Sequence, residues 1–304
     1  CDPLHKEKRD KLAKQSYGPQ ITEWSTGFAR FSDNGELWYC VHLIRKNAPW
    51  INKIFLVTDN QRPSWLTLHK QRELDITVVD HAEIFKDHLD CLPTFNSQSI
   101  ETMLFNIPGL SKSFVYFNDD CFIVKKTTSD DFFRKGKPVV RARFAFKNYV
   151  LDRVSARLAR RWLPKGYNGW RSWVKKGPWP FFVPFYLDIA HTPQSVITRE
   201  LECLYPDAEA LRDALSYRFR VTSQIAPIAY ISNLAVLRGA PLQLRHDWAY
   251  FDPRDEMHLL RKLDAMRTDK GIKFLCTRSL DTFSRSGRER IVSALGDILD
   301  GPRS

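Results

Sequence analysis

The sequence predicts an α/β fold built around a mainly parallel sheet. Short apolar segments typical of buried strands alternate with amphipathic segments typical of helices. The strand candidates are residues 53–58, 76–79 and 114–117. They end in Asp59-Asn60, Asp80-His81 and Asn118-Asp119-Asp120 respectively. Because α/β proteins bind ligands beyond the carboxyl ends of their strands, three polar strand ends on one edge predict a polar cleft there.

Helices are expected before, between and after these strands. A charged helix is expected within residues 1–26, followed by a helix from Leu37 to about Asn47 in which Asp33, three residues before Glu36, serves as the N-cap. Another should start at Asn96 or Ser97 and end before Pro108-Gly109. The C-terminal part reads as mostly helical, with helices near 207–217, 254–269 and 288–299 and a short strand at 273–276.

Composition places the chain among folded proteins of ordinary type. Its 304 residues, 43% hydrophobic and 27% charged, suffice for one large domain or two modest ones. No apolar run is long enough to span a bilayer, and no secretory signal is visible. Six scattered cysteines form no CxxC pair, so a zinc site of the usual spacing is not expected. The cysteines are expected to be reduced thiols.

The acidic pair after the third strand is the strongest site candidate. Asp119 and Asp120 would repel each other unless a cation or a proton separated them. A divalent metal that carries a phosphate group would do this, because hard cations prefer oxygen ligands. The alternative is a polar turn without a ligand, since Asn-Asp-Asp is also common turn chemistry.

Positive charge is concentrated in one part of the chain. Residues 134–177 contain 14 Lys or Arg and one acid, a net charge of +13 within a total of +12, so the rest carries about −1. Such a block favours a polyanion, an anionic membrane face or a phosphate-rich substrate. Residues 149–162 read as a basic amphipathic helix, followed by a stretch rich in Trp. Three readings remain open: membrane contact, stacking on sugars or nucleic-acid bases, and a helix packed on the body.

Several segments together resemble one family. They are residues 30–37 (RFSDNGEL), 48–59 (APWINKIFLVTD), 92–97 (LPTFNS), 99–101 (SIE), 107–111 (IPGLS) and 114–120 (FVYFNDD). This pattern is similar to the second conserved block of the Stealth family. That family includes bacterial capsular-polysaccharide hexose-1-phosphate transferases and the animal transferase that places N-acetylglucosamine-1-phosphate on lysosomal enzymes.

Shorter matches extend the resemblance. His191-Thr192-Pro193 and Arg218-Phe219-Arg220 resemble the third block. Residues 273–276, with Asp281, resemble the fourth, although Thr277-Arg278 replaces the expected Asn-Asp. Asp2-Pro3 resembles the end of the first block, whose strand has no counterpart in these 304 residues.

The resemblance implies a fold and a division of the chain. It implies a Rossmann-like, GT-A-like core with a helical basic insert and a helical C-terminal part. The expected regions are a donor-binding α/β half at 1–133, a Trp-rich insert at 134–185 and the remaining catalytic part at 186–304.

It also implies a reaction. A UDP-sugar would give hexose-1-phosphate, such as N-acetylhexosamine-1-phosphate, to an acceptor sugar hydroxyl, releasing UMP and forming a phosphodiester in capsular polysaccharide synthesis. The expected partners are a nucleotide-sugar donor, a polysaccharide acceptor and an anionic membrane contacted peripherally through 150–179, with no nucleic acid. The expected location is the bacterial cytoplasm, at the inner face of the membrane.

Residue roles follow from the same resemblance. Asp119 and Asp120 would hold Mg²⁺ or Mn²⁺, while Arg218 and Arg220 would bind phosphate oxygens. His191 is the first candidate for the general base, and Glu101 is its rival. The expected substrate-binding residues are Arg30, Asp33, Asn34 and Asn118.

Two other functions fit the sequence. One is a metal-dependent glycosyltransferase of the ordinary type, which attacks the anomeric carbon and releases UDP. The other is a non-catalytic module that binds an acidic polymer or membrane through residues 134–179.

Overall fold

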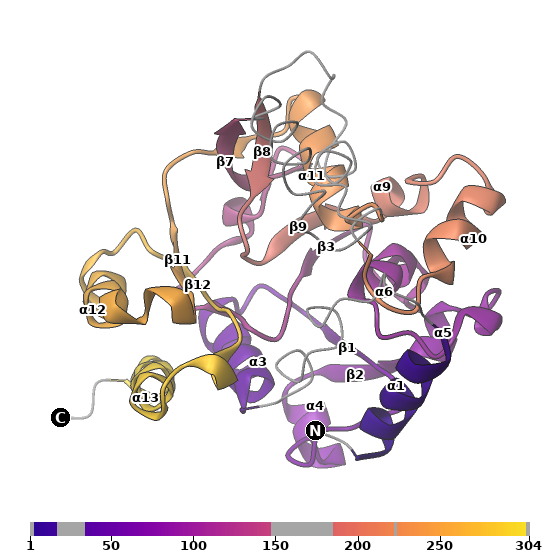
Figure 1. Ribbon diagram of the computed structural model, residues 1–304. Coiled ribbons are helices and arrows are strands. Elements are labelled where there is room, and N and C mark those ends of the chain that lie inside the picture. Colours follow the sequence, from indigo (N-terminus) through magenta and orange to yellow (C-terminus); the bar gives the residue numbers. More distant parts are fainter. Residues whose placement is uncertain (1–2, 17–33, 147–184, 222–223, 302–304) are drawn as a thin grey trace, which may run out of the picture.

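A computed structural model shows a mixed α/β protein in which several small sheets are flanked by helices (Figure 1). It describes residues 3–16, 34–146, 185–221 and 224–301. Arg30, Asp33 and the basic segment 147–184, including the helix expected at 149–162, lie outside the described residues. Within the described ranges, no helix combines the length and the apolar character needed to cross a membrane.

The first two predicted strands are confirmed and pair as expected. Strand β1 (Ile54–Thr58) runs parallel to β2 (Ile76–Asp80), in a register that sets Ile54 opposite Ile76. Helix α1 (Pro3–Ser16) precedes this pair in the chain. Helix α4 (Leu68–Glu73) lies between the two strands in sequence, and α5 (His81–Ile84) follows β2.

The helix expected from Leu37 is α3 (Glu36–Asn47). Its N-cap is Gly35, with φ of 88°, so the expectation that Asp33 would cap it was wrong. Glycine suits this position because it adopts positive φ without a steric penalty. The side chain of Glu36 folds back to accept the Asn34 amide N–H at 2.5 Å.

The third predicted strand forms but pairs elsewhere. Strand β3 (Ser113–Tyr116) runs antiparallel to β9 (Gln194–Ile197), and its residues are half-buried or exposed rather than fully buried. A cavity of about 760 Å³ lies between β1 and β3. The three predicted strands therefore do not form one parallel sheet: β1 and β2 form a parallel pair, and β3 belongs to a separate antiparallel pair.

The helix before β3 is confirmed. It consists of α6 (Ser97–Met103) continued by a 3-10 turn, η3 (Leu104–Asn106), and Asn96 caps it by accepting the Gln98 N–H. A further 3-10 turn, η2 (Leu89–Cys91), precedes it.

The largest apolar core surrounds a second sheet. Strands β4 (Cys121–Ile123), β12 (Phe274–Thr277) and β11 (Trp248–Phe251) lie in the order β11-β12-β4. The 3-10 turns η5 (Pro253–His258) and η6 (Leu280–Thr282) flank it. Helices α3, α12 (Leu259–Thr268) and α13 (Arg285–Asp300) cover it, which confirms the C-terminal helices and strand.

A third region joins the middle of the chain to its C-terminal part. Its strands are β5 (Phe133–Arg134), β6 (Lys137–Pro138), β7 (Val140–Phe146), β8 (Phe185–Ile189) and β10 (Leu242–Gln243), after the 3-10 turn η4 (Ser129–Asp131). Strand β7 pairs with both β8 and β10. Helices α9 (Thr198–Glu202), α10 (Ala208–Ser216) and α11 (Pro227–Leu237) follow β9 (Figure 1).

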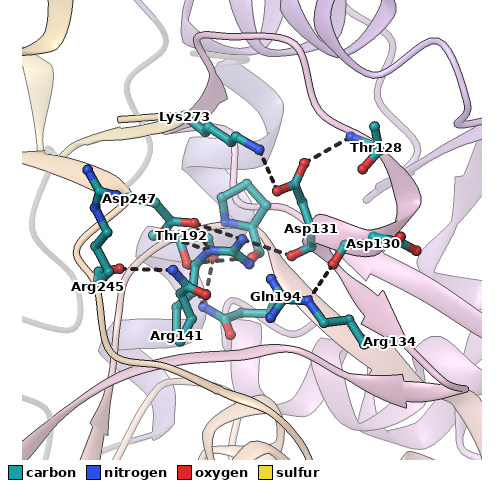
Figure 2. A network of polar contacts seen from close by, with 12 residues as sticks. Thr128, Asp130, Asp131, Arg134, Arg141, Thr192, Gln194, Arg245, Asp247 and Lys273 are labelled. Carbon is teal, nitrogen blue, oxygen red and sulfur yellow. Dashed lines mark hydrogen bonds and ion pairs between the residues drawn. The ribbon is translucent and has the colours of Figure 1, made fainter. Parts of the chain in front are cut away.

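A buried arginine ties this region to the second sheet (Figure 2). Arg141 is 2% exposed; its Nε donates to Asp247 at 3.0 Å, and its Nη2 donates to the Asp131 carbonyl at 2.8 Å. Its guanidinium also lies 4.2 Å from the ring centroid of Phe274. Lys273 pairs with the Asp131 carboxylate at 2.5 Å. The network thus connects β7 and η4 to the residues that enter β11 and β12.

Replacing Arg141 with Ala should lower the free energy of unfolding by about 3–5 kcal/mol, because Asp247 would be left buried without its charge partner. Arg143→Ala is the matched control: Arg143 lies on the same strand, is 61% exposed, and pairs with Asp188 at 3.5 Å, a surface pair worth about 0–1 kcal/mol. Urea unfolding of both variants measures the difference, and equal losses would contradict the role given to Arg141.

The Asp131 carboxylate should make the stability of the folded protein depend on pH. Burial alone would raise its pKa, but the hydrogen bonds from Lys273 and Thr128 outweigh burial and leave the pKa below its ordinary value of 3.8. A carboxyl whose pKa is depressed by folding adds stability above that ordinary value and loses it as pH falls through the folded pKa. Asp131→Asn should therefore be less stable than the parent near neutral pH, with the gap closing below pH 3.8. A gap that stays constant in thermal melts across this range would be inconsistent with an ionic role.

Candidate functional site

The site is built at the reversal of the chain between β3 and β4. Asn118, Asp119 and Asp120 form this turn, and Cys121 begins the new strand. The Cys121 N–H donates to the Asn118 carbonyl at 3.1 Å, and the Thr277 N–H donates to the Asp120 carbonyl at 3.0 Å. The turn is therefore held against the end of β12 and connects two separate sheets.

The two neighbouring acids have different surroundings. Asn118 and Asp119 line one end of the cavity between β1 and β3. Asp120 instead gathers with Cys121, His191 and Cys276, and the ligand atoms of these four residues all lie within 4.8 Å of one another. Burial, reinforced by the charge of Asp119, raises the pKa of Asp120 to about 7.

Three segments of the chain contribute to this four-residue cluster, which we call the thiol–imidazole cluster (Asp120, Cys121, His191, Cys276). His191 Nδ1 lies 2.8 Å from Cys276 Sγ, 3.7 Å from Cys121 Sγ and 3.9 Å from an Asp120 oxygen. Both cysteines are fully buried and stand directly opposite each other in the β4–β12 pairing. The hydrogen bond with Cys276 lowers the pKa of the Cys121 thiol.

A row of polar side chains connects Glu101 to His191. The Tyr116 hydroxyl lies 3.1 Å from Glu101 Oε1 and 2.7 Å from Asn118 Oδ1, and Asn118 Nδ2 lies 3.3 Å from His191 Nε2. Glu101 is buried, and this burial raises its pKa, although the charge of Arg220 opposes the shift. The structure thus places both candidates for the general base at the same site, at opposite ends of this row.

The two expected phosphate-binding arginines have different hydrogen-bond partners. Arg220 donates to Ser97 at the start of α6, and its electrostatic influence reaches Glu101 and His191. Arg218 instead donates to the backbone carbonyls of Asp90 and Pro93, where it holds the loop before α6. The geometry gives the two arginines different tasks.

The expected substrate-binding residues are only partly placed. Asn118 is at the centre of the site. Asn34 bonds to Glu36 at the start of α3 and does not line the cavity, as far as the described residues define it. Arg30 and Asp33 lie outside the described residues.

Sequence reasoning missed four residues of the site. The sequence places Tyr116 only in a strand and gives Cys121 no role. Cys276 enters only through the resemblance to the fourth block, and Arg278 only as a departure from it. Arg278 acts electrostatically on His191 and bonds to Asp252 at 3.4 Å. The position of Cys121 directly after an acidic turn was the one local signal, because the register of β4 against β12 cannot be read from the sequence.

Fold and site together define a mixed α/β protein with an acidic turn at a strand end, beside a buried carboxylate and an arginine. Residues 30–140 match the family model described as Stealth protein CR2, conserved region 2. The resemblance of this part of the chain to the second conserved block of the Stealth family is therefore confirmed. Glu101, the acidic turn and Cys121 lie inside the matched region, whereas His191, Arg220 and Cys276 lie beyond it.

Curated relatives support the same assignment. The chain is 42% identical over 133 residues to the capsular polysaccharide phosphotransferase cps1A of Actinobacillus pleuropneumoniae. The aligned segment covers 44% of this chain and 35% of that protein. It is 49% identical over 105 residues to the phosphotransferase fcs1 of Haemophilus influenzae, covering 34% and 28%. It is 45% identical over 109 residues to the mouse N-acetylglucosamine-1-phosphotransferase subunits alpha/beta, covering 36% and 8%. The matches thus span about a third or less of the relatives' length.

Proposed function

We propose that the protein transfers a sugar-1-phosphate from a nucleotide-diphosphate sugar to a hydroxyl of an acceptor sugar, in the synthesis of capsular or extracellular polysaccharide. The observation that carries the proposal is the assembly of the site. Residues within the Stealth region meet His191 and Arg220, which are distant in sequence, at one strand end. The relatives' names, which describe capsular and exopolysaccharide phosphotransferases, support the same class of reaction.

The proposed donor is a UDP-linked hexose, such as a UDP-N-acetylhexosamine. The acceptor oxygen would attack the phosphorus next to the sugar, and the bond to the bridging oxygen would break to release UMP. The anomeric bond would stay intact. The Rossmann-like, GT-A-like character of the donor-binding half is part of this proposal, and the parallel β1–β2 pair with its polar carboxyl ends supports it.

The donor groups at the turn suit two different ions. Asp119, which lines the cavity, offers a hard carboxylate ligand that fits Mg²⁺ or Mn²⁺. The thiols and imidazole beside Asp120 do not fit such an ion, because sulfur and nitrogen ligands select softer metals. We therefore keep Asp119 as the proposed ligand of the hard cation, which would neutralise diphosphate charge when bound.

Arg220 is the proposed phosphate clamp. Its Nε is buried and has no hydrogen-bond partner within the described part of the chain, while its Nη2 is held by Ser97. An arginine fixed at one end, with an N–H still available, is suited to bind a phosphate oxygen. In the transition state, such a donor would stabilise charge that develops on the transferred group.

Two groups can take the acceptor proton in this proposal. The His191 side chain is 48% exposed, so an acceptor can approach it. Glu101 is buried, and its raised pKa brings it closer to the range of an effective base at neutral pH. The Tyr116–Asn118 row connects the two, so a proton arriving at one end affects the hydrogen bonding of the other.

The proposed partners extend beyond the described residues. The basic segment within 134–185 would hold the polysaccharide acceptor or dock the protein on the anionic inner face of a bacterial membrane, and no nucleic acid would be bound. Four Arg→Gln changes at positions 153, 157, 160 and 161 should then weaken acceptor or vesicle binding more than donor hydrolysis.

The direct test is incubation with a panel of nucleotide sugars, an acceptor oligosaccharide and Mg²⁺ or Mn²⁺. The proposal expects release of UMP and formation of a phosphodiester. Release of UDP would instead identify an ordinary glycosyltransferase. Salt-sensitive polyanion binding without release of either nucleotide would identify a non-catalytic module.

Asp119→Ala should abolish turnover and its divalent-cation dependence, because it removes the carboxylate that faces the cavity. Its melting temperature should stay close to that of the parent protein. Turnover that persists with unchanged dependence on Mg²⁺ concentration would remove Asp119 from the proposed site.

Arg220→Lys should lower kcat/KM by at least about 10-fold, since lysine keeps the charge but loses the planar fork. Arg218→Lys is the matched control and should stay within about threefold of the parent, because Arg218 bonds only to backbone carbonyls among the contacts described. Equal losses in steady-state assays would show that both arginines handle phosphate.

A further inference from the structure

We propose that the thiol–imidazole cluster is a structural site for a thiophilic divalent metal, with Zn²⁺ as the natural occupant. The ligands would be Cys121 Sγ, Cys276 Sγ, His191 Nδ1 and one carboxylate oxygen of Asp120. This inference rests on the geometry of the cluster alone and is independent of the proposed transferase activity.

The distances suit tetrahedral coordination. Zinc–sulfur bonds of ~2.3 Å and zinc–nitrogen or zinc–oxygen bonds of ~2.0–2.1 Å place ligand atoms roughly 3.3–3.8 Å apart. In the cluster, Cys121 Sγ lies 3.7 Å from His191 Nδ1 and 3.6 Å from an Asp120 oxygen, and that oxygen lies 3.9 Å from His191 Nδ1. The 2.8 Å separation of His191 Nδ1 and Cys276 Sγ must widen by less than 1 Å.

The donor set selects the class of metal. Two thiolates, one imidazole and one carboxylate form a ligand set that zinc accepts and that Mg²⁺ or Ca²⁺ does not. Four protein ligands fill a tetrahedral shell and leave no open position, which is the arrangement of a structural rather than a catalytic site. The exposed His191 side chain provides the path by which an ion reaches the two buried sulfurs.

The second ring nitrogen of His191 has a polar neighbour that can adapt to a bound metal. The Tyr116 hydroxyl lies between Glu101 Oε1, at 3.1 Å, and Asn118 Oδ1, at 2.7 Å. In the structure the Asn118 oxygen accepts from this hydroxyl, and Asn118 Nδ2 lies 3.3 Å from His191 Nε2. A metal on Nδ1 would leave the imidazole proton on Nε2, and the Asn118 amide would then rotate to present its oxygen to that proton. Histidine ligands usually donate their second ring N–H to an oxygen in this way.

The metal would join segments that are distant in sequence. Asp120 and Cys121 belong to the turn into β4, Cys276 belongs to β12, and His191 lies between β8 and β9. Zinc would therefore fasten the β8–β9 connection onto the β11-β12-β4 sheet.

The test uses the full chain, purified under reducing conditions and stripped with a chelator. Elemental analysis after equilibration with Zn²⁺ and removal of excess metal should find one zinc per chain. Titration with Co²⁺ should give the absorption bands of tetrahedral cobalt with thiolate ligands. Cys276→Ser should weaken Zn²⁺ binding by at least about 100-fold, beyond the loss that an outer partner causes. Cys203→Ser, at an exposed cysteine outside the cluster, should bind Zn²⁺ like the parent.

Thermal melts separate a lost ligand from a damaged fold. In the presence of chelator, Cys276→Ser and the parent should melt at similar temperatures, and Zn²⁺ should raise the melting temperature of the parent and of Cys203→Ser only. Three results would overturn the proposal: no tightly held zinc, equal zinc binding by Cys276→Ser, or a Cys121–Cys276 disulfide in mass spectra with no metal uptake after its reduction.

Discussion

The antiparallel pairing of β4 with β12 is the constraint on which the rest of the site depends. It sets Cys121 opposite Cys276 and lets the Thr277 N–H bind the Asp120 carbonyl, so the acidic turn cannot move independently of the C-terminal sheet. Lys273 and Asp247, at the entries of β12 and β11, are held by Asp131 and Arg141. A buried ionic network and a strand register therefore fix together where the functional side chains lie.

This constraint also explains why two adjacent carboxylates need not share one ligand. The turn that reverses the chain sends Asp119 to the cavity beside β1 and Asp120 to the buried thiols. The two neighbouring carboxylates thereby have different partners, which lowers the electrostatic free energy of keeping both at one strand end. The proposed reaction uses Asp119 at the cavity, and the proposed zinc site uses Asp120 beside the two thiols.

Local features of this structure could be predicted from the sequence, whereas long-range pairings could not. The strands at 54–58 and 76–80, the helix capped by Asn96 and the Stealth region follow from apolar periodicity, capping chemistry and motif. The partner of β3 could not be predicted, because β9 lies some eighty residues later and a strand's own sequence does not specify its neighbour. For the same reason, Arg218 and Arg220 looked equivalent in the sequence. Only the packing shows that one bonds to a loop backbone and the other lies beside Glu101.

Asp119 and Asp120 are proposed to belong to two different metal environments, one hard and one soft. The most direct measurement is X-ray diffraction from crystals grown with Mn²⁺, Zn²⁺ and a UDP-sugar, with anomalous maps collected at both metal edges. We expect a zinc peak enclosed by Cys121, Cys276 and His191, and a separate manganese peak beside Asp119 on the cavity side. Both metals at a single position bridging the two carboxylates would contradict it.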